Sequence, residues 1–120
     1  MKFTVVQPNY PSADASACMA WMRAELDKLQ PGQREDIVLL PEYANTPGIE
    51  DRDALRAFAE TTGAEFLQHV AASAQRLGCL IATGAVVHEN EQWLNRTLVF
   101  DAAGEVVFHY DKIHLTTTES

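Results

Sequence analysis

Apolar residues in the first third of the chain recur with the spacing of a strand, a helix and a second strand. Residues 2–6 form a short β-rich run that ends before Pro8. Residues 13–30 carry apolar side chains at steps of three and four, which is the period of one helix face, and a Pro-Gly pair ends that helix. The continuous apolar run at residues 37–40 predicts a strand covered on both faces.

Two helical segments are expected next. Asp51 can cap a short helix, and residues 62–77 place their apolar side chains on one face of a longer one. Thr62 and Glu65 fit a capping box, in which the two side chains satisfy backbone N–H groups at the helix start. Gly78 stands where a left-handed helix end is expected.

The remaining apolar segments predict three strands, at residues 79–87, 93–101 and 105–115. Asp101 and Gly104 occupy the first and last positions of a turn that joins the last two strands. The order β-α-β-α-α-β-β-β predicts an α/β domain whose mixed sheet has parallel units first, antiparallel strands afterwards and flanking helices.

Composition narrows the class of protein. The 120 residues suffice for one core, and a net charge of −8, from 9 basic and 17 acidic residues, argues against binding to nucleic acid or to an anionic membrane surface. No apolar run approaches the ~18 residues of a membrane span. Cys18 and Cys79 form neither a disulfide framework nor a metal-binding spacing, so we expect a reducing, cytoplasmic environment.

Glu42 is the first candidate for chemistry. It follows the buried strand at residues 37–40, and ligands bind at the carboxyl ends of strands in open α/β sheets. Partial burial there would raise the pKa of this carboxyl group toward that of a general base. The alternative is an exposed loop acid or the cap of a following turn.

Lys112 is the second candidate. Strand alternation places it on the face of Val106, Phe108 and Tyr110, so its ammonium group must find a partner or extend to water. A fixed positive charge in that position could stabilise a developing oxyanion. An extended surface lysine near a strand end is the alternative.

The histidines and cysteines suggest no further site. His109 and His114 point to opposite faces of a regular strand, and His88 lies near a loop, so no ligand triad for a metal is expected. Cys18 and Cys79 are expected to be packed in the core. Cys79 could be considered as a nucleophile, but no neighbouring residue would activate it.

Four segments of the chain form a recognisable set: residues 39–43, 77–84, 95–105 and 110–115. The last of them, with its Tyr-x-Lys-x-His-Leu pattern, is the most specific. Together they resemble the nitrilase superfamily of carbon–nitrogen hydrolases, and the opening segment at residues 5–9 is similar to that family's first strand.

This resemblance implies the fold, the reaction and two residue roles. The fold would be part of a four-layer α-β-β-α sandwich, generally in an oligomer. The reaction would cleave a nonpeptide C–N bond of an amide-type small molecule through a thioester, with neither metal nor organic cofactor. Glu42 matches the glutamate that activates the cysteine thiol, and Lys112 matches the lysine that stabilises the tetrahedral intermediate.

One departure from the family pattern shapes the domain prediction. The family's nucleophilic cysteine follows the lysine by a few tens of residues, and neither Cys18 nor Cys79 matches it. We therefore expect residues 1–120 to be the N-terminal portion of such an enzyme, inactive alone, and associated with its C-terminal part or with a second copy.

Two alternatives to a hydrolase stay open: a truncated binding module of the same half-fold, and an α/β ligand-binding domain unrelated to the family. The sequence does not distinguish amide, carbamoyl and nitrile substrates. It also leaves open whether Tyr43 lines the pocket and whether His114 or Glu119 belongs to the site.

Overall fold

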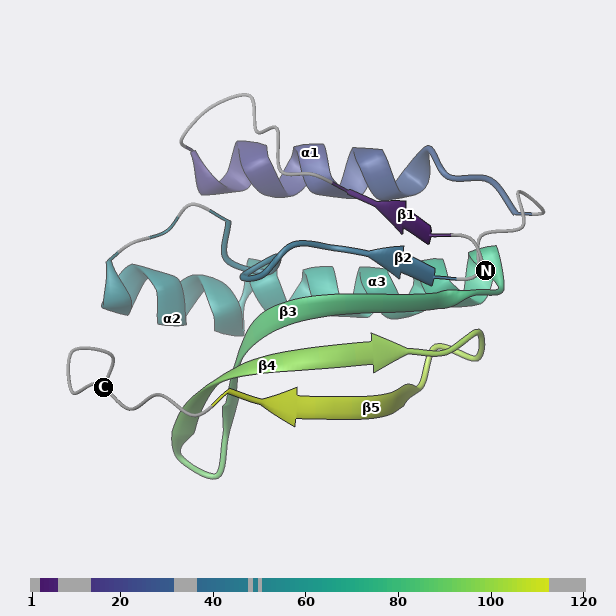
Figure 1. Ribbon diagram of the computed structural model, residues 1–120. Coiled ribbons are helices and arrows are strands. Elements are labelled where there is room, and N and C mark those ends of the chain that lie inside the picture. Colours follow the sequence, from purple (N-terminus) through teal and green to yellow (C-terminus); the bar gives the residue numbers. More distant parts are fainter. Residues whose placement is uncertain (1–2, 7–13, 32–36, 48, 50, 113–120) are drawn as a thin grey trace.

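The computed structural model describes residues 3–6, 14–31, 37–47, 49 and 51–112. The described strands form one five-stranded sheet in the order β1-β2-β3-β4-β5, parallel from β1 to β3 and antiparallel from β3 to β5 (Figure 1). This arrangement confirms the predicted α/β class and mixed sheet. The elements are β1 (Phe3–Val5), α1 (Ala15–Asp27), β2 (Ile37–Leu39), α2 (Arg52–Glu60), α3 (Thr62–Leu77), β3 (Leu80–Glu89), β4 (Gln92–Phe100) and β5 (Val106–Asp111).

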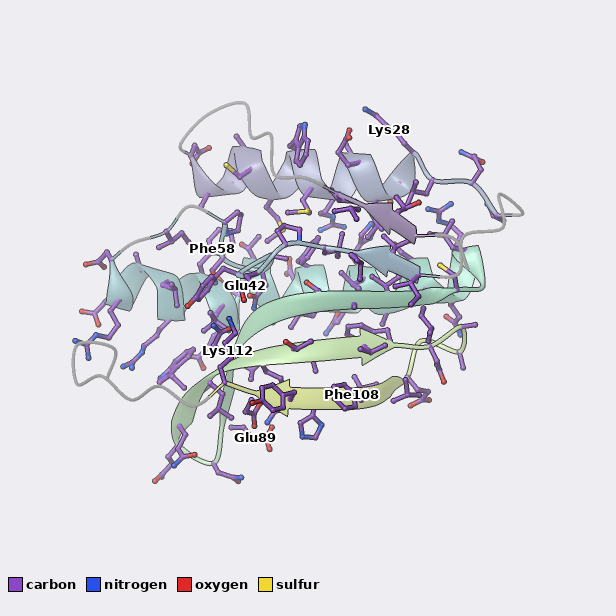
Figure 2. All side chains as sticks on the ribbon, in the orientation of Figure 1. Lys28, Glu42, Phe58, Glu89, Phe108 and Lys112 are labelled. Atoms are coloured by element: carbon purple, nitrogen blue, oxygen red, sulfur yellow. The ribbon has the colours of Figure 1, made fainter. Side chains whose placement is uncertain are left out.

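The helices α1 and α3 lie on the same face of the sheet (Figures 1 and 2). The crossover through α1 joins β1 to β2, and the crossover through α2 and α3 joins β2 to β3, so both advance in the same direction along the sheet. Because connections between parallel strands are right-handed, their helices are placed on one side.

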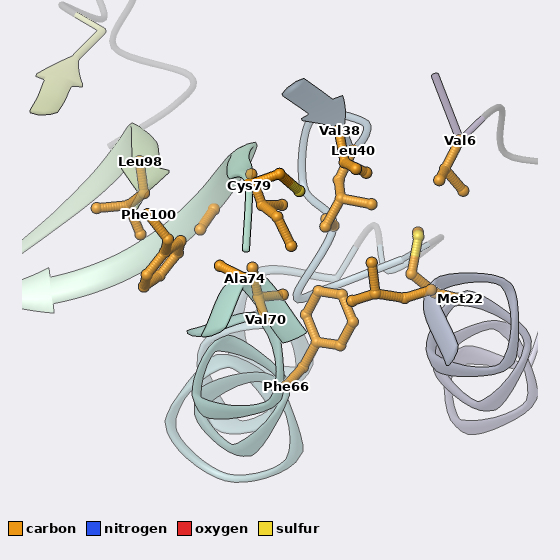
Figure 3. Close-up of a cluster of buried hydrophobic side chains, with 14 of the residues drawn as sticks. Val6, Met22, Val38, Leu40, Phe66, Val70, Ala74, Cys79, Leu98 and Phe100 are labelled. Atoms are coloured by element: carbon orange, nitrogen blue, oxygen red, sulfur yellow. The ribbon is translucent and has the colours of Figure 1, made fainter. Parts of the chain in front are cut away.

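The hydrophobic core fills the space between these helices and the sheet (Figure 3). Met22 of α1 and Phe66 and Val70 of α3 are fully buried there, against Val38 of β2 and Ile81 of β3. The apolar helix faces that the sequence predicts within residues 13–30 and 62–77 are therefore the faces that pack on the sheet.

The opposite face of the sheet is also apolar, and we call it the open sheet face. Strand alternation and register place its side chains away from the helices, and three of them, Val5, Phe108 and Tyr110, are 58%, 55% and 58% exposed. No described helix or strand covers this face. Within the described residues the strand at residues 37–40 is therefore packed by helices on one side, and its cover on both faces stays a prediction. The open sheet face consists of Val5, Ile37, Leu39, Leu80, Ala82, Val99, Phe108 and Tyr110.

Most of the predicted helix ends and turns are confirmed. The Asp51 carboxylate accepts a hydrogen bond from Ala54 N at 2.9 Å and caps α2. Gly78 ends α3 in the left-handed region with φ 67°. In the turn between β4 and β5, Gly104 N donates to the carbonyl of Asp101 at 2.9 Å.

The predicted capping box is wrong. The residue that precedes α3 is Thr61, and its hydroxyl donates to the carbonyl of Ala57 at 2.8 Å instead of accepting a bond from the new helix. Only Thr61 separates α2 from α3. Its hydroxyl group therefore bonds to the last turn of α2. Thr62 is already the first residue of the helix, and a reciprocal pair with Glu65 cannot form around it.

At the hairpin that joins them, β3 extends two residues and β4 one residue further than the pattern predicts. They reach a two-residue turn at Asn90 and Glu91, which both have positive φ, 52° and 64°, and turns of that type fit the twist of a hairpin. The last strand begins at Val106 and runs to Asp111. Residues 113–115 of the predicted strand lie outside the described residues.

Candidate active site

Glu42 lies in the loop that follows β2. The ladder between β2 and β3 continues one step past β2, where Leu40 N donates to Ala82 O at 2.8 Å. The next residue is a proline, which has no N–H to extend the ladder. The chain returns to β3 at Ala44, whose N–H donates to Gly84 O at 3.0 Å, so Glu42 lies between two points of attachment to β3.

Gly84 gives the loop the room it needs. A Cβ at this position would lie 2.9 Å from the Cα of Glu42, which is closer than side chains approach a backbone. Tyr43 then turns the chain with φ 55°, a region that bulky residues rarely adopt, and its carbonyl accepts from Thr46 N at 2.9 Å. The backbone around Glu42 is therefore tightly constrained against β3.

Lys112 follows directly after β5. Its backbone N–H donates to Asn95 O at 2.9 Å, so the pairing between β4 and β5 reaches this residue. The preceding residue, Asp111, points to the helix face, where its carboxylate receives two hydrogen bonds from Arg96, at 2.6 and 3.1 Å. Because side chains alternate along a strand, Lys112 points to the open sheet face.

The structure brings the two candidate side chains together, although they are 70 positions apart in the chain. The Nζ of Lys112 donates a hydrogen bond to Oε1 of Glu42 (Figure 2). That bond and the negative charge of Glu42 raise the pKa of Lys112, so the ammonium form is favoured. The carboxylate of Glu42 and the positive charge of Lys112 are therefore in contact near the carboxyl end of β2.

The environment of the pair differs from the sequence expectation. The Glu42 side chain is 60% exposed and that of Lys112 is 45% exposed. The expectation that the protein interior partly buries Glu42 is therefore wrong for the residues described here. What the described structure provides at Glu42 is contact with a cation.

Tyr43 and Asn95 join the two sides of the site. The side-chain amide of Asn95 donates to the Tyr43 hydroxyl at 3.2 Å, while the backbone carbonyl of Asn95 accepts from Lys112. Asn95 is 7% exposed and Tyr43 is 38% exposed. One buried residue of β4 thus contacts the residue beside Glu42 and the backbone of Lys112.

The other residues considered from the sequence lie elsewhere. Cys18 on α1 and Cys79 before β3 are both buried, as expected. Cys79 directly precedes β3 and lies five residues before Gly84, about 16 Å away along the strand. His114 and Glu119 lie outside the described residues.

The described residues offer neither a metal-binding cluster nor a membrane-spanning helix. They contain no group of three or more histidine, cysteine or acidic side chains arranged to hold a metal ion. Among them, no helix is both long and apolar enough to span a bilayer.

Sequence reasoning missed the residues that hold the site in place. Arg96 also contacts Glu89 at 2.6 Å, so it links β3, β4 and β5 with a side chain only 12% exposed. The side chain of Asn45 makes two buried hydrogen bonds to Val86. The sequence offers no signal for these supports, because nothing in it identifies the partners of Arg96 and Asn45.

Comparison with known proteins shows the family of this chain. The sequence matches the carbon-nitrogen hydrolase family over residues 2–120. It finds no match among curated proteins.

Solved structures share the fold. A CN-hydrolase superfamily protein from Xanthomonas campestris aligns with 98% of this chain at 24% identity and a TM-score of 0.70. A carbon-nitrogen hydrolase from Helicobacter pylori aligns with 98% at 17% identity and a TM-score of 0.75. A mutant of a Nesterenkonia amidase from the nitrilase superfamily aligns with 97% at 18% identity and a TM-score of 0.71.

The chain therefore belongs to the carbon-nitrogen hydrolase family, and the resemblance to the nitrilase superfamily is confirmed. It spans 42%, 41% and 44% of the lengths of those three structures.

The ion pair between Asp111 and Arg96, next to Lys112, predicts a pH dependence of stability. Hydrogen bonds from Arg96 lower the pKa of Asp111. A carboxyl group with a lowered folded-state pKa stabilises the protein above its unfolded-state pKa, about 3.9, and this stabilisation is lost as the pH falls through the folded-state value. We expect Asp111→Asn to reduce the free energy of unfolding at pH near 7 by up to about 1 kcal/mol, and this difference to disappear in acid.

Urea unfolding followed by circular dichroism across this pH range measures the effect. Glu105→Gln, which changes an exposed carboxylate beyond the turn, is the control and should leave the stability unchanged. A difference between Asp111→Asn and the unaltered protein that stays constant from neutral to acidic pH would contradict this account of the ion pair.

Proposed function

We propose that these residues provide the glutamate and lysine of a Glu–Lys–Cys hydrolase that cleaves nonpeptide C–N bonds of small amide substrates. The observation that carries the proposal is the contact between Glu42 and Lys112 at the carboxyl end of β2. A base and an oxyanion-stabilising cation are two of the three groups that nucleophilic acyl transfer requires.

In the proposed reaction Glu42 takes the proton of a cysteine thiol, and the thiolate attacks the carbonyl carbon of the amide. The positive charge of Lys112 stabilises the oxyanion that forms. The C–N bond then breaks as Glu42 returns the proton to the leaving nitrogen, which departs as ammonia or an amine. Water activated by Glu42 cleaves the resulting thioester, so the acid is released and the thiol is restored.

The nucleophile of this proposal lies outside the 120 residues. The sequence contains two cysteines, and both are buried away from Glu42. Cys18 faces the core from α1, which packs on the opposite side of the sheet from Lys112. A cysteine from a further segment would therefore have to approach over the open sheet face.

An amide is the favoured substrate class. The neighbour from Nesterenkonia is an amidase, and a related structure from that organism is described in complex with acrylamide. Both share the fold of this chain at less than 25% identity, so they support the reaction class and do not identify a substrate. The two buried cysteines fit a reducing, cytoplasmic setting.

Replacement of either charged residue tests the proposal. In the full protein that carries these residues, Glu42→Gln removes the base and Lys112→Met removes the cation. Each is expected to lower kcat for simple amides by about 10²- to 10⁴-fold while the fold is retained. Release of ammonia measures the rate, and Glu105→Gln is the control.

Two results would contradict the proposal. One is wild-type turnover in Glu42→Gln. The other is turnover of amides by the 120 residues alone, abolished by Glu42→Gln, since no described cysteine could serve as nucleophile. Absence of hydrolysis in the full protein, with a folded site, would favour a non-catalytic binding module instead.

We also infer that further protein covers the open sheet face, either a C-terminal part of the same polypeptide or a second copy. Eight apolar side chains spread over all five strands exceed the scattered exposure that is normal for a soluble monomer. That cover would also enclose Glu42 and Lys112 and reduce their contact with water.

The 120 residues alone are therefore expected to associate in light scattering and to bind a hydrophobic dye. Phe108→Ser and Tyr110→Ser should weaken both effects, because they reduce the apolar area of this face. A monodisperse monomer that binds no dye would contradict the inferred cover.

A further inference from the structure

The side chain of Asn45 forms the hydrogen bonds to β3 that a neighbouring strand would otherwise form beyond the end of β2. The strand β2 pairs with β3 only as far as Ala82, while β3 continues to Glu89. Beyond that pairing, Asn45 Nδ2 donates to Val86 O at 2.8 Å and Asn45 Oδ1 accepts from Val86 N at 2.9 Å. A side-chain amide carries the same donor and acceptor as a peptide group, so it completes this edge of the ladder.

This attachment has no substitute from water. Asn45 is 0% exposed and Val86 is 7% exposed. Loss of the amide would leave the N–H and C=O of Val86 buried without partners, which is costly. The loop is also held from the other side, because a Cβ on Gly63 of α3 would lie 2.4 Å from Asn45 O.

Glu42 lies between the attachments of this loop to β3. Leu40 and Ala44 are attached through backbone N–H groups, which do not depend on the identity of the side chain. Asn45 is attached through its side chain. It is therefore the attachment that a substitution can remove while the backbone of the loop is left intact.

We propose that Asn45 is a positioning residue, which holds the loop on β3 so that Glu42 lies over Gly84 and reaches Lys112. The catalytic meaning of this role rests on the proposed function. The contact itself does not, and it can be measured without any substrate.

The reactivity of Lys112 toward trace acetic anhydride reports the contact, because an ammonium group paired with a carboxylate gives up its proton less readily. The 120 residues contain three lysines, so the Lys112 and Lys28 products are readily separated by mass spectrometry. Lys28, which directly follows α1 and is paired with Glu25, serves as the internal reference. The experiment uses the full chain at about pH 8, where lysine is mainly protonated.

Glu42→Gln shows how far the labelling ratio rises when the contact with Lys112 is lost completely. Loss of an exposed ion pair is expected to raise the ratio of Lys112 to Lys28 labelling about two- to fivefold. Asn45→Ala is expected to give at least half of that rise, although it leaves Glu42 in the chain. Asn45→Ser, whose short hydroxyl cannot reach both groups of Val86, gives a second variant if Asn45→Ala does not fold.

Two controls separate positioning from general loss of stability. Thr46→Val changes the next residue of the same loop, whose buried hydroxyl has no hydrogen-bond partner among the described residues, and it should leave the ratio unchanged. Val70→Ala weakens the core from α3 and lowers the melting temperature, but it too should leave the ratio unchanged.

A labelling ratio in folded Asn45→Ala or Asn45→Ser equal to that of the unaltered protein would overturn the proposal. A ratio that rises equally in Val70→Ala would also overturn it, because the effect would then follow stability alone. A rise specific to the Asn45 variants, in a full protein that hydrolyses no amide, would keep the positioning role and reject the hydrolase.

Discussion

The backbone of β3 is the constraint on which the site depends. One edge of this strand carries the end of the parallel half of the sheet, through the bonds from Leu40, Ala44 and Asn45. The other edge carries the antiparallel hairpin of β4 and β5. Glu42 comes from the first half and Lys112 from the second, so their contact exists only while both halves are in register on β3.

The contact between Glu42 and Lys112 is not a plausible source of stability. Both side chains are exposed, and exposed ion pairs contribute little because water and salt screen them. The geometry is instead maintained by buried groups around the pair. Cover over the open sheet face would lower the local dielectric and strengthen the attraction, so the same two residues would act more strongly in a closed site.

Local signals predicted most of the fold because each depends on a few neighbouring residues. The helix periods, the cap at Asp51, the left-handed end at Gly78 and the turn at Asp101 are of this kind. The capping box predicted at Thr62 and Glu65 failed because Thr61 precedes α3 and Thr62 is already its first helical residue, so Thr62 does not occupy the capping position.

The candidate site was less accessible to sequence reasoning, because its supports depend on register. A turn that paired Asp101 with Gly104 directly would place Arg96 opposite His109. In the structure Asp101 N donates to Glu105 O, and an irregularity at Val99 and Phe100 adds a second shift. The two shifts together preserve the face on which Lys112 lies, so its alternation with Phe108 and Tyr110 was predicted correctly. The placement of Val106 on that face is wrong, because the irregularity sets Val106 opposite the core residue Phe100. Because of these shifts, Arg96 lies opposite Asp111 and not opposite His109, which the pattern could not show.

The separation between Lys112 Nζ and the Glu42 carboxylate oxygens, in an experimental structure of the full protein, tests the central claim most directly. The account predicts direct contact, within about 4 Å, with Ala44 and Asn45 attached to β3. A separation beyond about 6 Å, in a protein whose five strands keep this order, would contradict it.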